Sequence, residues 1–309
     1  MKQIKTAKTG KTGRLQLRRH WQKHLMMVPV LVILGLFCYY PMAGIAIAFQ
    51  NYLPGKGFFG SQWVGMQWFE YMFSMPNFKQ VVWNTLFLSL LKLSTSLICS
   101  VVLALMLNEM QIRWLKSLIQ SFALFPFFVS WVVLADIVKD IASNEGLINQ
   151  IVYAITGQTI PFLTDNGWFT VLLVVSNIWK EVGYNAIIIM AALTAIDPTL
   201  YEAATLDGAG RFQKMRFITL PGIRNIVMVL LILALGNVMS AGFDQIYNLY
   251  NTTVMAGADI IDTYVYRMGV NGGLYSLGTA VGLFKSVVGT ILLILAYRAA
   301  DKYAGYRIF

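Results

Sequence analysis

The stretch Glu202-Ala203-Ala204-Thr205-Leu206-Asp207-Gly208, followed by Ile218-Thr219-Leu220-Pro221, is a polar interruption in an otherwise apolar chain. A short helix is expected to begin before it, because Asp197 is a good N-cap and Pro198 is tolerated in a first helical turn. Gly208 permits a sharp change of direction that a residue with a Cβ resists. A second short helix over 209–217, and a restart of the chain at Leu220-Pro221, complete a predicted helix-turn-helix outside the bilayer.

The composition around this stretch is that of a membrane protein. Hydrophobic residues make up 57% of the 309 residues and charged residues only 12%, whereas soluble domains are about 25% charged. The net charge of +10 is explained by basic residues on the cytoplasmic side rather than by nucleic-acid binding. Cys38 and Cys99 fall in apolar stretches without metal-like spacing, so neither a disulfide nor a metal site is expected.

Six stretches are apolar and long enough to cross a bilayer, which takes about 20 residues each. The sequence therefore predicts an all-α polytopic membrane protein with six transmembrane helices. The predicted spans are 25–49, 82–107, 119–141, 169–194, 223–243 and 278–298. The remaining parts are a basic tail at 1–24, an external segment at 50–81, a core at 82–298 that contains the polar loop 197–222, and a tail at 299–309.

Basic residues outside these spans are distributed unevenly. With the N-terminus inside, the inner side holds eight basic residues of the tail together with Arg113, Lys116, Arg211, Lys214, Arg216, Lys302 and Arg307. The outer side holds Lys56, Lys79 and Arg267. This asymmetry follows the positive-inside rule, so both termini and the 197–222 segment are predicted to be cytoplasmic.

Polar side chains inside the spans are costly in lipid and indicate a pathway or a buried contact. Asn177, Glu181 and Asn185 recur at a spacing of four, which makes one helix face polar. Planar polar groups beside aromatic rings suit a hydroxyl-rich ligand such as a sugar, and the charged members favour an acidic one. In the alternative interpretation, Glu181 pairs with Lys285 or Lys92 and only fixes helix packing. The predicted substrate pathway comprises Asn177, Trp179, Lys180, Glu181, Tyr184, Asn185, Asn237, Ser240, Phe243, Asp244, Gln245 and Lys285.

The external segments carry their own signals. Residues 50–81 hold an aromatic cluster that suits either an interfacial belt on the membrane or a contact for an external binding protein. Residues 142–167 are expected to form a short outer excursion, and 244–277, rich in Tyr, Asn and Gly, an outer loop. The aromatic cluster consists of Trp63, Trp68, Phe69, Tyr71 and Phe73.

The opening stretch resembles the EAA loop of ATP-binding-cassette (ABC) importer permeases, whose pattern is EAA, three residues, Gly, nine residues, and Ile, any residue, Leu-Pro. The run Asn177-Ile178-Trp179 with Gly183 and Asn185 is similar to the same region of carbohydrate-type permeases. Gly242-Phe243-Asp244-Gln245 and Gly282-Leu283-Phe284-Lys285-Ser286-Val287 resemble the polysaccharide (Lpl-type) subgroup. The resemblance covers residues 25 to 309.

The resemblance implies a type I ABC importer permease fold and a subunit that transports a sugar or oligosaccharide without being an enzyme. No cofactor is expected on this chain, because ATP and Mg would be held by two cytoplasmic ATPase subunits. The other implied partners are a second, different permease chain and an extracytoplasmic solute-binding protein, in a bacterial cell membrane. The residues implied in the ATPase contact are Glu202, Ala203, Ala204, Asp207, Gly208, Arg211, Leu220 and Pro221.

Two other classes of protein are weighed against this one. An ion-coupled secondary transporter of a polar solute is the alternative, and such carriers often show inverted repeats and helices broken at the midplane. The sequence gives no sign of either feature. A membrane enzyme needs an acid-base or metal constellation, but the two histidines, His20 and His24, both lie in the basic tail.

Overall fold

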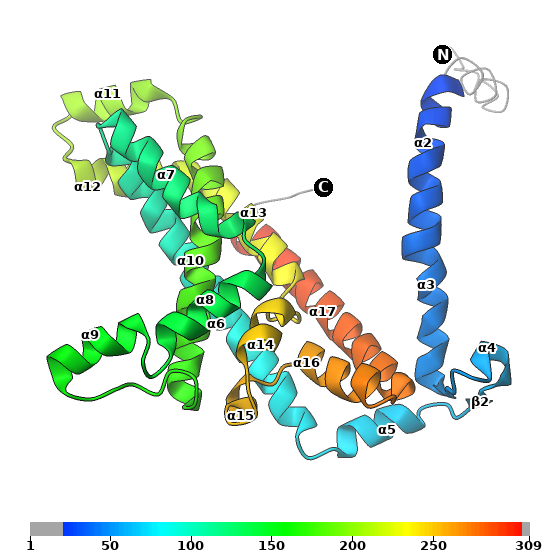
Figure 1. Cartoon of the computed structure of the whole chain (residues 1–309). Coiled ribbons are helices and arrows are strands. Elements are labelled where there is room, and N and C mark those ends of the chain that lie inside the picture. Colours follow the sequence, from blue (N-terminus) through cyan, green and yellow to red (C-terminus); the bar gives the residue numbers. More distant parts are fainter. Residues whose placement is uncertain (1–20, 305–309) are drawn as a thin grey trace, which may run out of the picture.

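The computed structural model describes residues 21–304 as a helical membrane protein (Figure 1). Of the predicted tails, residues 1–20 and 305–309 lie outside the described residues. Within the described part, five helices are long and apolar enough to cross a membrane, or six when one bent pair is counted as a single span.

The first span is a rod that stands apart from the other helices (Figure 1). It runs from Trp21 to Phe49 and contains the predicted span 25–49. Its outer end packs on the last helix and on the external helix α5, and most of its apolar side chains are exposed. The rod consists of α2 (Trp21–Leu34), the π-helical η1 (Gly35–Tyr39), α3 (Tyr40–Met42) and the 3₁₀-helical η2 (Ala43–Phe49).

Three predicted spans lie within long helices that pack together. α6 (Phe78–Glu109) contains 82–107, α10 (Asn166–Leu193) contains nearly all of 169–194, and α17 (Tyr275–Ala304) contains 278–298. The start of α10 is fixed by Asp165, whose side chain accepts a hydrogen bond from the backbone N–H of Trp168 at 2.9 Å. α6 and α10 share the most extensive helix–helix contact in the described chain, so these two helices form its centre.

The third predicted span, 119–141, is not one straight helix. α7 (Arg113–Phe128) and α8 (Trp131–Ala142) are separated by a short break, and the pair is bent by 108°. Pro126 lies in the last turn of α7, where its ring and missing N–H weaken the helix. The side chain of Ser130 then caps the start of α8. The next helix, α9 (Leu147–Thr156), lies within the segment 142–167 that is predicted to form an outer excursion.

The fifth predicted span, 223–243, ends earlier than expected. α13 (Leu220–Gly236) stops at Gly236 and a turn leads into α14 (Phe243–Leu249). The expected outer loop 244–277 instead folds back into the core, because the apolar face of α14 places Ile246 and Leu249 among buried residues of α8 and α10. Its other helices are α15 (Met255–Ala258), α16 (Ile261–Val265) and the π-helical η4 (Tyr266–Asn271).

The segment 50–81, which is predicted to be external, combines a small hairpin with a helix. β1 (Gln50–Asn51) pairs antiparallel with β2 (Gln62–Trp63), with α4 (Gly57–Gly60) between them and α5 (Gln67–Ser74) after them. Trp68 donates from its indole nitrogen to the carbonyl oxygen of Gln50 at 3.0 Å, while Trp63 and Tyr71 are exposed. Part of the aromatic cluster therefore holds the segment together, and the exposed part fits both interpretations of its role.

Candidate functional site

The 197–222 segment forms a hairpin that begins with a well-capped helix. The carboxylate of Asp197 accepts a hydrogen bond from the backbone N–H of Thr199 at 2.9 Å. Hydrogen bonds from Thr199 lower the pKa of the Asp197 carboxyl below its ordinary value, because they stabilise the charged form. α11 (Pro198–Leu206) then follows with Pro198 in its first turn, as the sequence predicts.

The turn of the hairpin is a glycine-terminated helix end. Gly208 has a φ of +78°, and its N–H donates to the carbonyl oxygen of Thr205 at 3.0 Å. The N–H of Ala209 donates to the carbonyl oxygen of Ala204 at 2.8 Å, which completes a Schellman motif. No atom lies within 4 Å of a Cβ added at Gly208, so the backbone conformation, and not lack of space, requires glycine here.

The second arm differs from the predicted separate short helix. α12 (Arg211–Lys214), the π-helical η3 (Met215–Thr219) and α13 run as one helix from Arg211 to Gly236. The helix continues through Leu220-Pro221 without a break. Pro221 lies in the first turn of α13, directly after the π-helical η3. There its missing N–H is tolerated next to the changed register of the π-helix. The hairpin is therefore continuous with the fifth span.

Hydrogen bonds tie the two arms together. The hydroxyls of Tyr201 and Thr219 lie 3.0 Å apart, and the Lys214 ammonium donates to the hydroxyl of Thr205 at 2.7 Å. Within the second arm, the side-chain oxygen of Gln213 accepts from the backbone N–H of Gly210 at 2.8 Å at the start of α12. These contacts make the hairpin a braced unit.

Most predicted ATPase-contact residues lie on the surface of this hairpin. Ala204 is half-buried, and the other predicted residues are exposed: Glu202, Ala203, Asp207, Gly208, Arg211, Leu220 and Pro221. The structure adds two apolar side chains, Leu206 at 90% and Phe212 at 67% exposed. Sequence reasoning passed over both, although large apolar residues within a polar segment were a usable signal.

A cavity of about 410 Å³ is lined by residues of α6, α10, α13 and the turn that follows α13. Its wall contains the predicted pathway residues Asn177, Glu181 and Asn185 from α10, and Asn237 from the turn. The polar face predicted from the spacing of four therefore does line a cavity. The other lining residues are Ser89, Lys92, Leu93, Ser96, Leu97, Leu230, Ala234, Val238, Ala241 and Gly242.

Lys180 lies outside this cavity and contacts the break in the third span. Its buried ammonium donates to the carbonyl oxygens of Pro126 at 3.3 Å, Phe127 at 3.0 Å and Val129. These carbonyls belong to the end of α7, where helical partners are missing. Lys180 is therefore a helix-capping residue in this structure.

Gln245 and Lys285 are not in the cavity wall either, although the side-chain oxygen of Gln245 accepts from the cavity-wall residue Lys92 at 2.6 Å. The Gln245 amide donates to the carbonyl oxygen of Leu173 at 2.7 Å and to the hydroxyl of Ser176 at 2.9 Å. Lys285 forms an ion pair of 2.5 Å with Asp262. The predicted pairing of Glu181 with Lys285 is thus wrong. Among the described residues Glu181 and Lys92 form no close ion pair, although their opposite charges attract each other.

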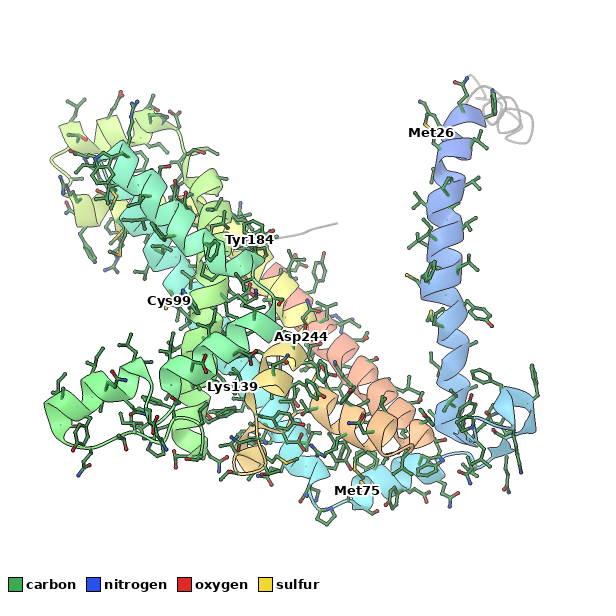
Figure 2. All side chains as sticks on the ribbon, in the orientation of Figure 1. Met26, Met75, Cys99, Lys139, Tyr184 and Asp244 are labelled. Carbon is green, nitrogen blue, oxygen red and sulfur yellow. The ribbon has the colours of Figure 1, made fainter. Side chains whose placement is uncertain are left out.

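The remaining predicted pathway residues lie outside the cavity wall. Tyr184 stacks on Phe127 with ring centroids 4.2 Å apart, and Phe243 stacks on Tyr247 at 5.2 Å. Trp179, Tyr184 and Asp244 are exposed and Ser240 is half-buried; Tyr184 and Asp244 are labelled in Figure 2. The structure therefore gathers the amides of the prediction into one cavity and leaves its aromatic rings elsewhere.

Lys92, Ser89 and Ser96 are the polar side chains of the cavity wall that the predicted pathway lacks. The sequence suggests Lys92 only as a pairing partner of Glu181, although the spacing of Lys92 from Ser89 and Ser96 places all three on one face of α6. In the part of the chain that the structure describes, no group of three or more metal-ligating side chains is present. The chemistry of this cavity is thus hydrogen bonding with one cation and one carboxylate.

Comparisons with known proteins agree with this geometry. The chain is 43% identical to protein LplB of Bacillus subtilis over 97% of this chain and 95% of the relative. It is 42% identical to the polygalacturonan/rhamnogalacturonan transport system permease protein YteP of Bacillus subtilis, over 98% and 95%. A bacterial ABC transporter involved in the import of the acidic polysaccharide alginate has a solved chain that matches with a TM-score of 0.88 and 34% identity, over 95% of this chain and 99% of that one.

A second structure of a bacterial alginate ABC transporter, in complex with an alginate pentasaccharide-bound periplasmic protein, matches with a TM-score of 0.86 and 34% identity, over 93% and 96% of the two chains. The family model described as the binding-protein-dependent transport system inner membrane component matches residues 96–304. The braced hairpin and the cavity residues from Ser96 onward fall within that range, whereas the cavity residues Ser89, Lys92 and Leu93 precede it. The chain belongs to the family of binding-protein-dependent transport system inner membrane components.

Proposed function

We propose that this chain is a membrane-spanning subunit of an ATP-driven importer of acidic oligosaccharides, with the 197–222 hairpin as its contact for an ATPase. One observation carries the proposal: both arms of the hairpin lead directly into helices that line the polar cavity. α11 follows α10 after a short connection, and the second arm is continuous with α13. Membership of the family favours this function over a self-contained ion-coupled carrier.

The second arm is suited to transmit a movement. A helix rises about 1.5 Å per residue, so the 26 residues from Arg211 to Gly236 act over roughly 40 Å. Asn237 follows directly and lines the cavity. A displacement of the braced hairpin is therefore carried to the cavity wall without a flexible joint, apart from the local adjustment that the π-helix permits.

The exposed surface of the hairpin suits a protein partner. Glu202 offers a charge, while Leu206 and Phe212 offer apolar side chains that an aqueous surface leaves unpaired. Apolar anchors beside a charged group are typical of binding hot spots. ATP and Mg would be held by the ATPase, whose closure around ATP supplies the differential binding that a conformational switch requires.

The substrate class is supported by the cavity and by the relatives. Amide, hydroxyl and carboxylate side chains in the cavity match the hydrogen-bonding groups of a saccharide, and Lys92 adds a cation. The names of YteP and of the alginate transporter specify acidic polysaccharides. A binding protein on the outer side would deliver the saccharide, and a second permease chain would complete the pathway.

The hairpin contact is tested by charge reversal in the complete complex. Glu202→Lys is expected to leave the chain in the membrane and to lower uptake of trigalacturonate into proteoliposomes to background. The ATPase should be recovered in reduced amount with the purified mutant complex. Glu145→Lys, an exposed acid between α8 and α9, serves as the matched control and should transport normally. Unimpaired uptake by Glu202→Lys would refute the proposed contact.

A further inference from the structure

Lys92 stands out because it is a cation in the wall of the cavity and is only 5% exposed. A charged group in the middle of a spanning helix is costly and persists for a functional or strong packing reason. The other buried lysine of the described residues, Lys180, donates hydrogen bonds to the three carbonyl oxygens at the end of α7. Lys92 therefore needs an account of its own.

The position of the Lys92 ammonium is fixed by the break between α13 and α14. It donates to the carbonyl oxygen of Ala241 at 2.6 Å and to the side-chain oxygen of Gln245 at 2.6 Å. Ala241 has a φ of +43°, a conformation that a residue with a Cβ seldom adopts. This turn thus directs a backbone carbonyl at the ammonium, which holds the charge in place at the cavity wall.

The two acceptors leave part of the donor capacity of Lys92 for another partner. An ammonium has three N–H donors, and two of them are accounted for by Ala241 and Gln245. Within the described residues no ion pair involves Lys92. A carboxylate that entered the cavity would supply the missing acceptor as a charge-assisted hydrogen bond.

Two hydroxyls on the same face of α6 point to a ligand independently of the charge. Ser89 and Ser96 flank Lys92 in the cavity wall and are buried. Their Oγ atoms have no hydrogen-bond partner among the described residues. An unpaired buried hydroxyl is unfavourable, so a ligand with hydroxyl groups would satisfy two groups that the protein leaves open.

The opposite wall is complementary. Glu181 from α10 presents a carboxylate, flanked one helical turn away on either side by the amides of Asn177 and Asn185. A carboxylate accepts hydrogen bonds from sugar hydroxyls, while the amides both donate and accept. The cavity therefore has a cationic wall and an acceptor-rich wall facing each other.

We infer that Lys92 is the specificity-determining residue of the cavity, binding the carboxylate of a uronate unit while Glu181, Ser89 and Ser96 bind its ring hydroxyls. The inference rests on the proposed function and adds the residue that recognises the negative charge of the substrate. A neutral sugar of the same shape forgoes the contact with Lys92 and leaves that donor unpaired. The Lys92 ammonium is hydrogen-bonded at the turn between α13 and α14. The substrate carboxylate bound by Lys92 therefore lies next to α13, the helix that is continuous with the hairpin.

The test compares trigalacturonate with its methyl ester, which has the same ring hydroxyls but no charge. Binding is measured by calorimetry on the complete permease–ATPase complex in nanodiscs, without the binding protein, so that the permease alone discriminates. The wild-type complex is expected to bind the free acid at least about tenfold more tightly, the range of a hydrogen bond to a charged group. Lys92→Gln should remove this preference while retaining affinity for the ester.

Lys180→Gln is the matched control, because Lys180 is the other buried lysine and lies outside the cavity wall. It should lower stability but keep the preference for the acid. Equal binding of acid and ester by the wild-type complex would overturn the inference and leave the proposed transport function standing. A preference for the acid that survives Lys92→Gln would also overturn the inference. So would an equal loss of affinity for acid and ester in Lys92→Gln, because that result indicates that Lys92 has a packing role alone.

A second variant keeps the inference testable if Lys92→Gln does not assemble. The double change Ser89→Ala and Ser96→Ala removes no hydrogen bond of these side chains within the described structure and should preserve the fold. It is expected to weaken acid and ester by the same severalfold factor, because both ligands carry the ring hydroxyls. Unchanged binding of both ligands would contradict the placement. Binding of neither ligand to the wild-type complex would refute the proposed substrate class and this inference together.

Discussion

Two adjacent residues of α10, Lys180 and Glu181, have opposite surroundings although both are charged and lie in one span. Lys180 is buried against the end of α7 and Glu181 faces the cavity. Successive residues of a helix point about 100° apart, so neighbours in sequence meet different helices. The cost of burying the Lys180 charge is offset by three carbonyl acceptors at the end of α7, of which Pro126 also accepts from the backbone N–H of Val129 at 3.2 Å.

Lys180→Met is expected to destabilise the protein without acting on the cavity. The change removes the lysine donor from the carbonyl oxygens of Phe127 and Val129, at a cost of about 3 kcal/mol for acceptors left unsatisfied, while the carbonyl oxygen of Pro126 keeps the backbone N–H of Val129. Thermal unfolding of the purified complex should show a clearly lowered midpoint. The control is Lys139→Met on α8, where a 41% exposed side chain makes only a 4.0 Å contact with Asp136. An unchanged midpoint for Lys180→Met would contradict the capping role.

At the scale of elements, α7 and α10 pack with their backbones in close approach. A Cβ built at Gly183 would lie 2.0 Å from the carbonyl oxygen of Ala123 and 2.3 Å from its carbonyl carbon. Small residues at such crossings let spanning helices meet closely, since packing and not the hydrophobic effect holds helices together in lipid. The close approach of α7 and α10 at Gly183 also determines how far the side chain of Lys180 must extend to contact the α7–α8 break.

Gly183→Ala should therefore separate α7 from α10. Overpacking of this kind costs about 1–3 kcal/mol, and here the obstacle is a rigid backbone rather than a flexible side chain. The expected result is a lower unfolding midpoint and less complex recovered on purification. Gly282→Ala in α17 is the control, because no atom lies within 4 Å of an added Cβ there. Equal behaviour of the two variants would mean that the close approach is not needed.

At the scale of the whole molecule, the hairpin and the excursion containing α9 lie at opposite ends of the helical core (Figure 1). The positive-inside rule predicts that the hairpin end lies in the cytoplasm, where an ATPase and its nucleotide are available. The polar cavity lies between these ends, within the helices α6, α10 and α13.

Cysteine labelling in intact cells tests this orientation. In a chain with Cys38→Ser and Cys99→Ser, a thiol at Leu206→Cys should react with a membrane-impermeant maleimide only after the membrane is opened. A thiol at Ile155→Cys should react from outside. Both positions are highly exposed in the chain by itself, at 90% and 79%, and the cells express the chain without its ATPase partner, so that the membrane and not the proposed contact decides the result. The reverse pattern would exclude contact of the hairpin with a cytoplasmic ATPase.

Much of the architecture followed from local sequence. The spans 25–49, 82–107, 169–194 and 278–298 were predictable because continuous apolar stretches must be helical in lipid. Asp197 and Gly208 marked the two ends of α11 because caps depend on nearby residues. The expected absence of broken helices was wrong at α7–α8 and α13–α14, although Pro126 in the last turn of α7 is a local signal for the first break.

The sequence by itself determined which segments are helical, where the polar hairpin lies and which family pattern it carries, because hydropathy, caps and spacing are local properties. Only the tertiary structure decided which polar side chains share a cavity. Asn177, Glu181 and Asn185 face Lys92 on α6, whereas Lys180, Gln245 and Lys285 are held by backbone or side-chain partners from other elements. The physical reason is that a buried polar group takes its role from the hydrogen-bond partner opposite it, and that partner comes from a distant part of the chain.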